Sequence, residues 1–458
     1  MGLEVVILAA GQGTRMRSQR PKVLHRLGAF ALVEHVHRLA VALEPSKIAI
    51  VYGHGGAQLR AEMAHLSALW IEQAERLGTG HAVQQAIDHL DPNATVLILY
   101  GDVPLLSQDT VRRLLSAAEP DCLAVLTVRL DDPKGYGRIV RDEQGAVVGI
   151  VEERDCSEAE RHIQEVNSGI MALPVRRLKA WLAQLKNQNA QGEYYLTDII
   201  GFAAAEGVPV RALMTLDADE VLGVNDRRQL AHLERSYQAR MAQQLMTLGV
   251  MLRDPARFDL RGIIPSVGED VELDVNVVLE GTIEIGHRVR IGPQVVLRDV
   301  VIGDDVEILA GSVVEGAILA AGSRIGPMAR VRPGSVIGPA AHVGNFVEIK
   351  NTQLGAGSKV NHLSYVGDAE VGTSVNLGAG TITCNYDGVH KHRTVIEDDA
   401  FIGSATQLVA PVRIGAGATI GAGSTITRDA PAGQLTLSRV RQSSLEHWRR
   451  PRKDPERR

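Results

Sequence analysis

Cysteine is scarce in this chain, and the few cysteines it has are poorly placed for pairing. The 458 residues include 3 cysteines, Cys122, Cys156 and Cys384, which stand far apart. An odd number at such spacing excludes a disulfide framework, and no Cys-x-x-Cys pair supports a cysteine-based metal site. A reducing compartment, the cytoplasm, is therefore the simplest expectation.

The chain also has no long apolar run and no large excess of positive or negative charge, and its aromatic residues are few. No run of about 18 apolar residues is present, so we expect no membrane span. The apolar start of the chain has no basic flank, which argues against a signal peptide. The net charge of −5 gives no reason to expect nucleic acid as a partner. Aromatic residues make up only 3% while 46 residues are glycine, a balance that suits a β-helix with an aliphatic interior.

A six-residue repeat of aliphatic side chains fills the second half. Its unbroken stretch consists of Ile396, Ile402, Leu408, Ile414, Ile420 and Ile426. Shorter runs with the same spacing are Ile337, Val343 and Ile349, then Leu354, Val360 and Val366, then Val371 and Leu377. A hexapeptide repeat predicts a parallel β-helix, in which each repeat makes one flat side and its aliphatic residue points inward. We expect roughly nine to ten coils between Asp254 and Asp429, with a loop ejected at Cys384–Arg393, where the repeat breaks.

Residues 1–225 alternate strand-like and helix-like segments. The strand candidates are Val5–Ala10, Ile48–Tyr52, Val96–Tyr100, Cys122–Val128 and Val147–Val151, with helical stretches such as Leu32–Ala42 and His81–Leu90 between them. This βαβ rhythm predicts a Rossmann-like α/β domain, with a mostly parallel sheet and helices on both faces. The amphipathic segment 226–253 is expected to be a connecting helix, although a core helix of the first domain would show the same period.

The β-helix domain, 254–458, is expected to end in a basic tail. The tail residues are Arg439, Arg441, Arg449, Arg450, Arg452, Lys453, Arg457 and Arg458. We expect this tail to be solvated, with a contact to a polyanion as the alternative.

Two segments follow predicted strands at the carboxyl edge of the sheet, where open α/β sheets bind ligands. The first, Leu8–Met16, offers glycine N–H groups to a phosphate chain, and Arg15 and Lys22 add positive charge. Met16 stands where a dinucleotide-binding loop would carry its third glycine, so a triphosphate suits the loop better. The second segment places Asp102 at the end of a buried strand, as a Mg²⁺ ligand or a simple cap. Together the two segments favour a nucleotide–metal site.

The solenoid carries one histidine inside a repeat that otherwise holds small or aliphatic residues, His362. A lone histidine is more often a packing residue than a base, but the polar residues around this one along the chain raise its interest. They are Arg332, Glu348, Lys350, Asn376, Asn385, Tyr386 and Ser404. At roughly eighteen residues per coil, these side chains would stack near one another. Cys384 is not needed as a nucleophile, and the spacing of His390 and His392 is poor for zinc.

The motifs of both halves resemble those of one enzyme family. Leu8–Met16 with Pro21 and Lys22 is similar to the sugar-nucleotidyltransferase signature L-A-A-G-x-G-T-R-M followed by P-K. Further matches are Gln73, Leu77–Gly80, Tyr100–Asp102, Gly135–Gly137, Glu152, Asn167, Tyr194–Asp198 and Gly223–Asn225. With the hexapeptide half, the whole pattern resembles the GlmU family, bacterial bifunctional N-acetylglucosamine-1-phosphate uridyltransferase/glucosamine-1-phosphate acetyltransferase.

This resemblance implies a cytoplasmic enzyme that makes UDP-N-acetylglucosamine, a precursor of bacterial wall and outer-envelope sugars. The C-terminal half would acetylate glucosamine 1-phosphate with acetyl-CoA. The N-terminal half would then join the product to UTP with the help of Mg²⁺ and release pyrophosphate. The resemblance also implies a left-handed β-helix that assembles as a homotrimer.

The resemblance further implies site residues. UTP and UDP-N-acetylglucosamine would be bound by Leu8, Ala9, Gly11, Lys22, Gln73, Gly78, Thr79, Tyr100, Gly101, Asp102, Gly137, Glu152, Asn167, Thr197 and Asn225. Asp102 and Asn225 would hold Mg²⁺, and Arg15 with Lys22 would neutralise charge during catalysis. In the solenoid, His362 would be the general base, supported by Glu348. Glucosamine phosphate would be bound by Arg332, Lys350, Tyr365, Asn376 and Lys391, and acetyl-CoA by Ala379, Asn385, Tyr386, Ser404, Ala422 and Arg439.

Two alternatives compete with this interpretation. One is a monofunctional sugar-1-phosphate nucleotidyltransferase with a structural β-helix, and the polar residues around His362 argue against it. The other is a non-catalytic scaffold that merely senses nucleotide, which Arg15, Lys22, Asp102 and Asn225 argue against. Release of pyrophosphate from UTP would separate an enzyme from a scaffold.

Overall fold

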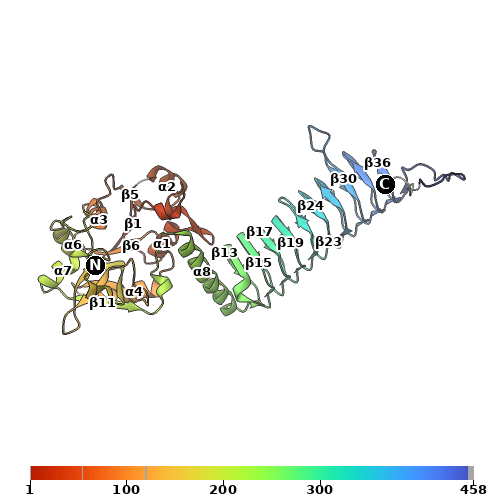
Figure 1. The fold of residues 1–458 in the computed structure, drawn as a ribbon. Coiled ribbons are helices and arrows are strands. Elements are labelled where there is room, and N and C mark those ends of the chain that lie inside the picture. Colours follow the sequence, from red (N-terminus) through yellow and green to blue (C-terminus); the bar gives the residue numbers. More distant parts are fainter. Residues whose placement is uncertain (1, 54, 119–120, 452–458) are drawn as a thin grey trace, which may run out of the picture. The chain divides into compact units, whose positions relative to one another are not determined.

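The chain forms two compact units, Met1–Arg240 and Met241–Arg458. The structure is a computed structural model that describes residues 2–53, 55–118 and 121–451 (Figure 1). The basic residues Arg452, Lys453, Arg457 and Arg458 of the predicted tail lie outside the described residues. Among the described residues, no helix has the length and apolar character that a membrane crossing needs.

The first unit is built on a mostly parallel sheet in the order β11-β7-β10-β6-β1-β4-β5 (Figure 1). These strands are β1 (Leu3–Ala9), β4 (Lys47–Tyr52), β5 (Leu69–Glu72), β6 (Thr95–Tyr100), β7 (Leu123–Arg129), β10 (Glu165–Pro174) and β11 (Val210–Thr215). The hairpin of β8 (Arg138–Arg141) and β9 (Val147–Val151) joins the sheet at β10. The five predicted strands are confirmed. The strands β5, β8, β10 and β11 were not foreseen, and β10 runs antiparallel to both β6 and β7.

Helices cover both faces of this sheet, as the βαβ rhythm predicts. Alternate residues of β1 show the division: Val5 and Ile7 join one buried cluster, while Val6 and Leu8 join the other. The helices are α1 (Leu32–Val41), α2 (Gly56–Glu62), α3 (Thr79–Ile87), α4 (Gln108–Ala117), α5 (Glu158–Arg161), α6 (Val175–Leu182) and α7 (Asp198–Ala205). Residues of α1, α2 and α4 belong to the first cluster, and residues of α3, α6 and α7 to the second.

Short elements and one long helix complete the first unit. Short 3₁₀ turns are η1 (Thr14–Met16), η2 (Lys22–Leu24) and η3 (Ala218–Glu220), and β2 (Arg26–Leu27) pairs with β3 (Phe30–Ala31). The predicted amphipathic helix is α8 (Arg227–Thr247), and the division between the units falls inside it. Its residues Leu233 and Tyr237 are buried in the first unit, while Ala242 and Leu245 join the core of the second.

The second unit is the expected parallel β-helix. One face is an eleven-stranded sheet of β12 (Met251–Leu252), β14 (Glu272–Leu273), β16 (Arg290–Ile291), β18 (Glu307–Ile308), β20 (Arg324–Ile325), β23 (His342–Asn345), β26 (Lys359–His362), β29 (Asn376–Leu377), β32 (Phe401–Ile402), β35 (Thr419–Ile420) and β37 (Leu435–Thr436). The solenoid therefore extends slightly beyond both predicted ends.

A second sheet of the solenoid turns around a corner to form its other faces. Its strands are β13 (Phe258–Val267), β15 (Val277–Ile285), β17 (Val296–Ile302), β19 (Val313–Leu319), β21 (Arg330–Val331), β24 (Glu348–Lys350), β27 (Tyr365–Gly367), β30 (Ile382–Cys384), β33 (Gln407–Val409), β36 (Thr425–Ile426), β22 (Val336–Ile337), β25 (Gln353–Leu354), β28 (Ala369–Val371), β31 (Thr394–Ile396) and β34 (Val412–Ile414). The single turn η4 (Pro255–Arg257) precedes β13.

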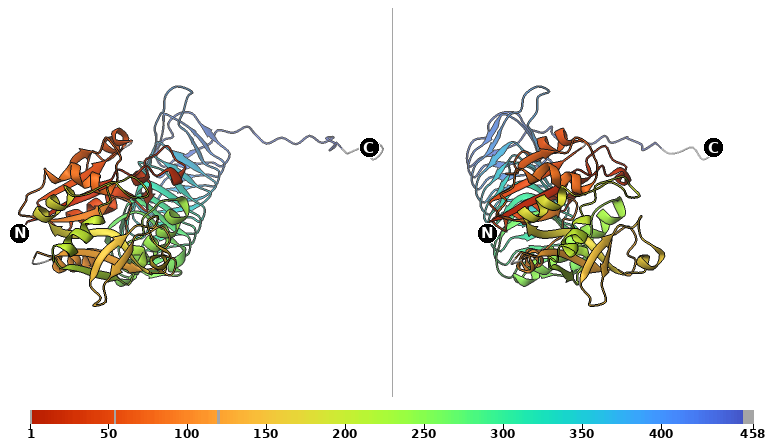
Figure 2. Two further views of the ribbon diagram at one scale, coloured as in Figure 1. Left: turned by 60° about the vertical axis from the view of Figure 1, so that its left-hand side comes forward. Right: turned by 90° about the vertical axis from the view of Figure 1, so that its left-hand side faces the viewer.

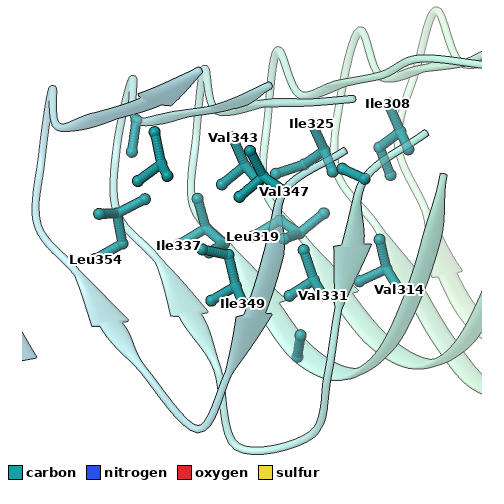
Figure 3. Close-up of a cluster of buried hydrophobic side chains, with 14 of the residues drawn as sticks. Ile308, Val314, Leu319, Ile325, Val331, Ile337, Val343, Val347, Ile349 and Leu354 are labelled. Carbon is teal, nitrogen blue, oxygen red and sulfur yellow. The ribbon is translucent and has the colours of Figure 1, made fainter. Parts of the chain in front are cut away.

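The hexapeptide aliphatics fill the solenoid interior. Each of the six residues from Ile396 to Ile426 in the unbroken run exposes at most 3% of its surface. Figure 3 shows the shorter runs in the same role, with Ile337, Val343, Ile349 and Leu354 pointing into the space enclosed by the coils. Because every flat side of every coil contributes one such residue, the stacked coils share one continuous apolar core.

Successive coils stack residues that are 17 or 18 positions apart. The step lengthens to 25 at the predicted break in the repeat, where Asp398 accepts a hydrogen bond from Thr373 N. The additional residues leave the stack as the loop that follows β30 (Figures 1 and 2). The ejected loop at Cys384–Arg393 is thus confirmed, and the coil after it pairs as though the loop were absent.

Candidate active sites

A cavity of about 770 Å³ opens in the first unit, where β1 and β6 end. The predicted nucleotide residues that line it are Leu8, Ala9, Gly11, Lys22, Gln73, Gly78, Thr79, Tyr100 and Asp102. Arg15 lies nearby in η1, but its side chain is exposed and is not among the residues that line the cavity. The parallel strands explain this gathering, because their carboxyl ends share one edge of the sheet.

Two of the residues that line this cavity, Lys22 and Asp102, form an ion pair. The Lys22 ammonium is paired with the Asp102 carboxylate, and its Nζ lies 3.3 Å from Oδ1 of Asn225. The side chains of Lys22 and Asp102 are only 11% and 15% exposed. The backbone holds the two segments together, since Val224 N donates to Asp102 O at 2.9 Å. Two side-chain oxygens from distant segments therefore converge on one cation.

These two oxygens fit the predicted magnesium site. Mg²⁺ prefers oxygen ligands and usually keeps waters and substrate phosphates around one or two protein groups. The described residues contain no cluster of three or more His, Cys, Asp or Glu side chains suited to a metal. A magnesium ion at Asp102 and Asn225 would accordingly take most of its ligands from water and phosphate.

Gln73 and Gly78, two of the predicted nucleotide residues, are closely packed at this cavity. Gln73 is 3% exposed, and its side-chain amide donates to Gly78 O at 3.1 Å. Gly78 has φ +105°, and a Cβ there would lie 2.6 Å from the carbonyl oxygen of Tyr194. Only glycine fits this position, which lets the backbone pass close to a ligand.

Four more of the residues predicted to bind UDP-N-acetylglucosamine form a second cluster, Gly137, Glu152, Asn167 and Thr197. Thr197 Oγ1 donates to Glu152 Oε1 at 2.9 Å, and Asn167 N donates to Gly137 O at 2.8 Å. A Cβ on Gly137 would lie 3.5 Å from both carboxylate oxygens of Glu152. Burial raises the pKa of Glu152, although the Thr197 hydrogen bond opposes the shift. The polar groups of this cluster are of the kind that bind sugar hydroxyl and amide groups.

In the solenoid, His362 stands at the end of β26. Its Nδ1 lies 2.9 Å from Oδ1 of Asn345, the residue one coil earlier. With an amide oxygen as acceptor, Nδ1 carries the proton and Nε2 keeps its lone pair. The sequence analysis missed Asn345, although the coil step of 17 residues points to it.

The predicted support of His362 by Glu348 is not what the structure shows. Glu348 Oε1 instead accepts a hydrogen bond from Arg332 Nη1 at 2.9 Å. The register explains the difference: Asn345 pairs with His362 along the sheet, while Glu348 pairs with Tyr365. Glu348 therefore belongs to the next side of the coil.

The predicted phosphate ligand Lys350 has an ion-pair partner of its own. Its Nζ lies 2.9 Å from Oδ2 of Asp368, and this contact is the main reason that the pKa of Lys350 is raised. Asn385, at the start of the ejected loop, donates to the same carboxylate and lies 3.4 Å from the Tyr365 hydroxyl. Sequence reasoning missed Asp368 too.

Four of the six predicted acetyl-CoA residues, Ala379, Ser404, Ala422 and Arg439, follow one another in the coils after His362. Gly380 N donates to His362 O at 3.4 Å, and Ala405 N donates to Ala379 O at 2.7 Å. Further along, Gly423 N donates to Ser404 O at 2.8 Å, and Arg439 Nη1 donates to Ala422 O at 2.9 Å. A long, thin ligand laid along these coils would reach the histidine at one end.

The remaining predicted residues lie on the loop and on the adjoining face. Tyr386 and Lys391 face each other in an antiparallel bridge within the ejected loop. Asn376 lies in β29, between Lys359 of the preceding coil and Phe401 of the next.

Comparison with known proteins matches both halves. Residues 5–198 match the MobA-like NTP transferase domain, residues 265–343 the GMPPB C-terminal domain, and residues 393–428 six bacterial transferase hexapeptide repeats. The bifunctional protein GlmU of Methylococcus capsulatus is 62% identical over 99% of this chain and 98% of its own length. The chain belongs to the GlmU family.

A second relative agrees with this membership. The bifunctional protein GlmU of Stutzerimonas stutzeri is 56% identical over 99% of this chain and 100% of its own length. Among solved structures, UDP-glucose pyrophosphorylase complexed with UDP-glucose is 15% identical, with a TM-score of 0.44, over 52% of this chain and 100% of that chain. The prediction of a bifunctional enzyme of UDP-N-acetylglucosamine synthesis is confirmed, with a nucleotidyltransferase half and a hexapeptide acetyltransferase half.

Proposed function

We propose that the Lys22–Asp102–Asn225 cavity performs uridyl transfer and that the His362 corner performs acetyl transfer. In this assignment the uridyltransferase domain is 1–225, the linker helix is 226–253 and the acetyltransferase domain is 254–458. The observation that carries the proposal is the placement of predicted residues from distant segments at two separate sites. We also propose a cytoplasmic location, which the three described cysteines, none of them in a disulfide, favour.

Uridyl transfer needs positioning more than acid–base chemistry. The phosphate of N-acetylglucosamine 1-phosphate is already an anion, so its oxygen attacks the α-phosphorus of UTP in line and pyrophosphate leaves. Lys22 neutralises charge on the phosphates, while Glu152, Asn167 and Thr197 orient the sugar. Mg²⁺, held by Asp102 and Asn225, would supply further neutralisation of the charge that develops on the phosphate oxygens.

Acetyl transfer needs a base. His362 Nε2 takes a proton from the 2-amino group of glucosamine 1-phosphate, and the amine nitrogen attacks the thioester carbonyl of acetyl-CoA. The C–S bond then breaks, and the coenzyme A sulfur leaves with a proton. Arg332 and Lys350 hold the sugar phosphate. Asn385 and Tyr386 would supply donors that steady the oxyanion.

A coupled assay tests both assignments at once. The protein would receive glucosamine 1-phosphate, acetyl-CoA, UTP and Mg²⁺, with free thiol and pyrophosphate followed separately. We expect thiol release that does not depend on UTP, and pyrophosphate release that follows it. Pyrophosphate formed only from added N-acetylglucosamine 1-phosphate, with no thiol at any time, would overturn the role of His362.

We further propose that the enzyme is a homotrimer, on the evidence of an exposed apolar column beside His362. Met328, Phe346 and Leu363 occupy the same corner of successive coils and are 53%, 60% and 64% exposed. All three have left-handed backbone angles, with φ between 47° and 55°. That conformation costs a bulky residue about 1–2 kcal/mol relative to the right-handed region. Large exposed side chains held at such a cost favour burial against another copy of the solenoid.

Replacing Phe346 with glutamate should therefore dissociate the assembly. A charge placed in a covered apolar patch costs several kcal/mol of association energy, so sedimentation at micromolar concentration should show monomers. Val301→Glu is the matched control, since Val301 is also exposed, at 42%, but lies outside the column. A Phe346→Glu protein that stays trimeric would place the interface elsewhere.

A further inference from the structure

One buried carboxylate in the solenoid has no role in the reaction described so far. Asp368 lies at the corner between β27 and β28 and is 8% exposed. Its backbone is in the left-handed region, with φ 50°. Burying an ionised group is unfavourable unless several donors compensate for the water it loses. The partners of Asp368 therefore indicate what this residue is for.

Three side-chain donors, drawn from two other coils, meet on this carboxylate. Lys350 and Asn351, in the coil before, lie 2.9 Å from Oδ2 and 2.8 Å from Oδ1 respectively. Asn385, in the coil after, donates to Oδ2 as well. The carboxylate thus links Lys350, the expected ligand of the sugar phosphate, to Asn385, an expected neighbour of the reacting carbonyl.

The backbone of Asp368 strengthens the same link. Its N–H donates to Lys350 O at 2.9 Å, and its carbonyl accepts from Thr394 N at 3.3 Å. Thr394 is the first residue after the ejected loop, whereas Asn385 is near its start. One residue therefore holds both ends of the loop that carries Tyr386 and Lys391.

The surroundings of Asp368 favour its ionised form. Burial disfavours the charge, but hydrogen bonds from Asn351, Lys350 and Asn385 outweigh it and lower the pKa of Asp368. An anion cannot itself bind a phosphate, and the structure shows no contact between this carboxylate and His362. Its contribution must pass through the donors that it holds.

We propose that Asp368 is a positioning residue for acetyl transfer, which fixes the Lys350 ammonium and the Asn385 amide in one geometry around glucosamine 1-phosphate. This inference rests on the proposed function, because it takes the phosphate-binding role of Lys350 from there. Among the residues expected to bind acetyl-CoA, Asn385 contacts this carboxylate, whereas Ala379, Ser404 and Ala422 do not. The effect of Asp368 should therefore fall mainly on glucosamine 1-phosphate, with a smaller effect on acetyl-CoA.

The test is the Asp368→Asn enzyme, which keeps the shape and removes the charge. A hydrogen bond to a charged group contributes enough for its loss to weaken binding about tenfold or more. We expect the KM for glucosamine 1-phosphate to rise about tenfold or more, and the KM for acetyl-CoA to change less than about twofold. Simple loss of folded protein would lower the rate and leave both KM values unchanged, so unchanged KM values would overturn the proposal.

A matched control exists at another coil corner. Asp305 also has a left-handed backbone, with φ 59°, and its carboxylate pairs with Arg288 of the preceding coil at 2.7 and 2.8 Å. Asp305→Asn removes an equivalent ion pair at an exposed place away from the site. It should leave both KM values unchanged, and an equal rise in Asp305→Asn would overturn the proposal.

Two further variants separate this inference from the proposed function. If Lys350→Ala raises the KM for glucosamine 1-phosphate and Asp368→Asn does not, only the inference about Asp368 fails. If Lys350→Ala itself has no effect on that KM, the proposed phosphate site fails and the inference falls with it. The double variant should raise this KM by less than the product of the two single effects, because Asp368 acts in part through Lys350. Should Asp368→Asn not fold, Asp368→Glu displaces the same contacts while keeping the charge, and the same selective rise is expected.

Discussion

Replacing Asp102 with alanine should abolish uridyl transfer and leave acetyl transfer intact. The change removes one of the two oxygens expected to hold Mg²⁺ and leaves the largely buried Lys22 ammonium without its ion-pair partner. Loss of such preorganised charge costs about a hundred- to a thousandfold in turnover. Pyrophosphate release from UTP and N-acetylglucosamine 1-phosphate measures the effect, while thiol release from acetyl-CoA reports the other half.

Asp109→Ala is the matched control for this experiment. Asp109 is an exposed carboxylate in the first turn of α4, in the same unit but not among the residues that line the cavity. It should keep normal pyrophosphate release. Normal uridyl turnover in Asp102→Ala would show that the ion pair serves stability alone.

Replacing His362 with alanine should suppress acetyl transfer by about a hundred- to a ten-thousandfold, the usual contribution of a general base. Uridyl transfer should persist when N-acetylglucosamine 1-phosphate is supplied, because the two sites share no residue. Asn345→Ala should produce a smaller loss, since it frees the imidazole to adopt the other tautomer without removing the base.

His287→Ala controls for the loss of any histidine from the solenoid. His287 lies in an early coil, where its Nδ1 accepts a hydrogen bond from Glu269 N at 3.0 Å. Acetyl transfer should be unaffected by this change. An equal loss of both activities in a folded His362→Ala protein would contradict the two-site assignment.

Much of the fold could be predicted because its two halves carry strong and different periods. The six-residue period identifies Ile402, Ile414 and Ile420 as core residues, and the structure buries all three completely. The strand β10 was missed since it follows a hairpin and reverses direction, which an alternation of strands and helices does not reveal. Whether a strand runs parallel or antiparallel to its neighbours depends on tertiary pairing, which the local sequence pattern does not indicate.

The two sites differ in how far sequence reasoning reached. Lys22, Asp102 and Asn225 come from separate motifs, and the parallel topology explains why they meet. In the solenoid, the coil step is 17 residues at some positions and 18 at others. A shift of one residue turns a side chain to the opposite face of its strand. The pairing of Glu348 with His362 came from the family resemblance. Glu348 lies fourteen positions before His362, less than one coil step, and the structure instead pairs Asn345 with His362.

The stacking of coils has a consequence for how the second unit comes apart. Each coil is held chiefly by the one before and the one after, so cooperativity is nearly one-dimensional and opening begins at the ends. The strand β37 has a neighbour on one side only within the described part of the chain. Ala422 and Arg439 lie in the last coils at that end, whereas Lys350 and His362 lie several coils further from it. Amide hydrogen exchange should therefore be faster where coenzyme A is expected to bind than where the sugar is expected to bind. Bound coenzyme A would contact several of the last coils and so slow the exchange at that end.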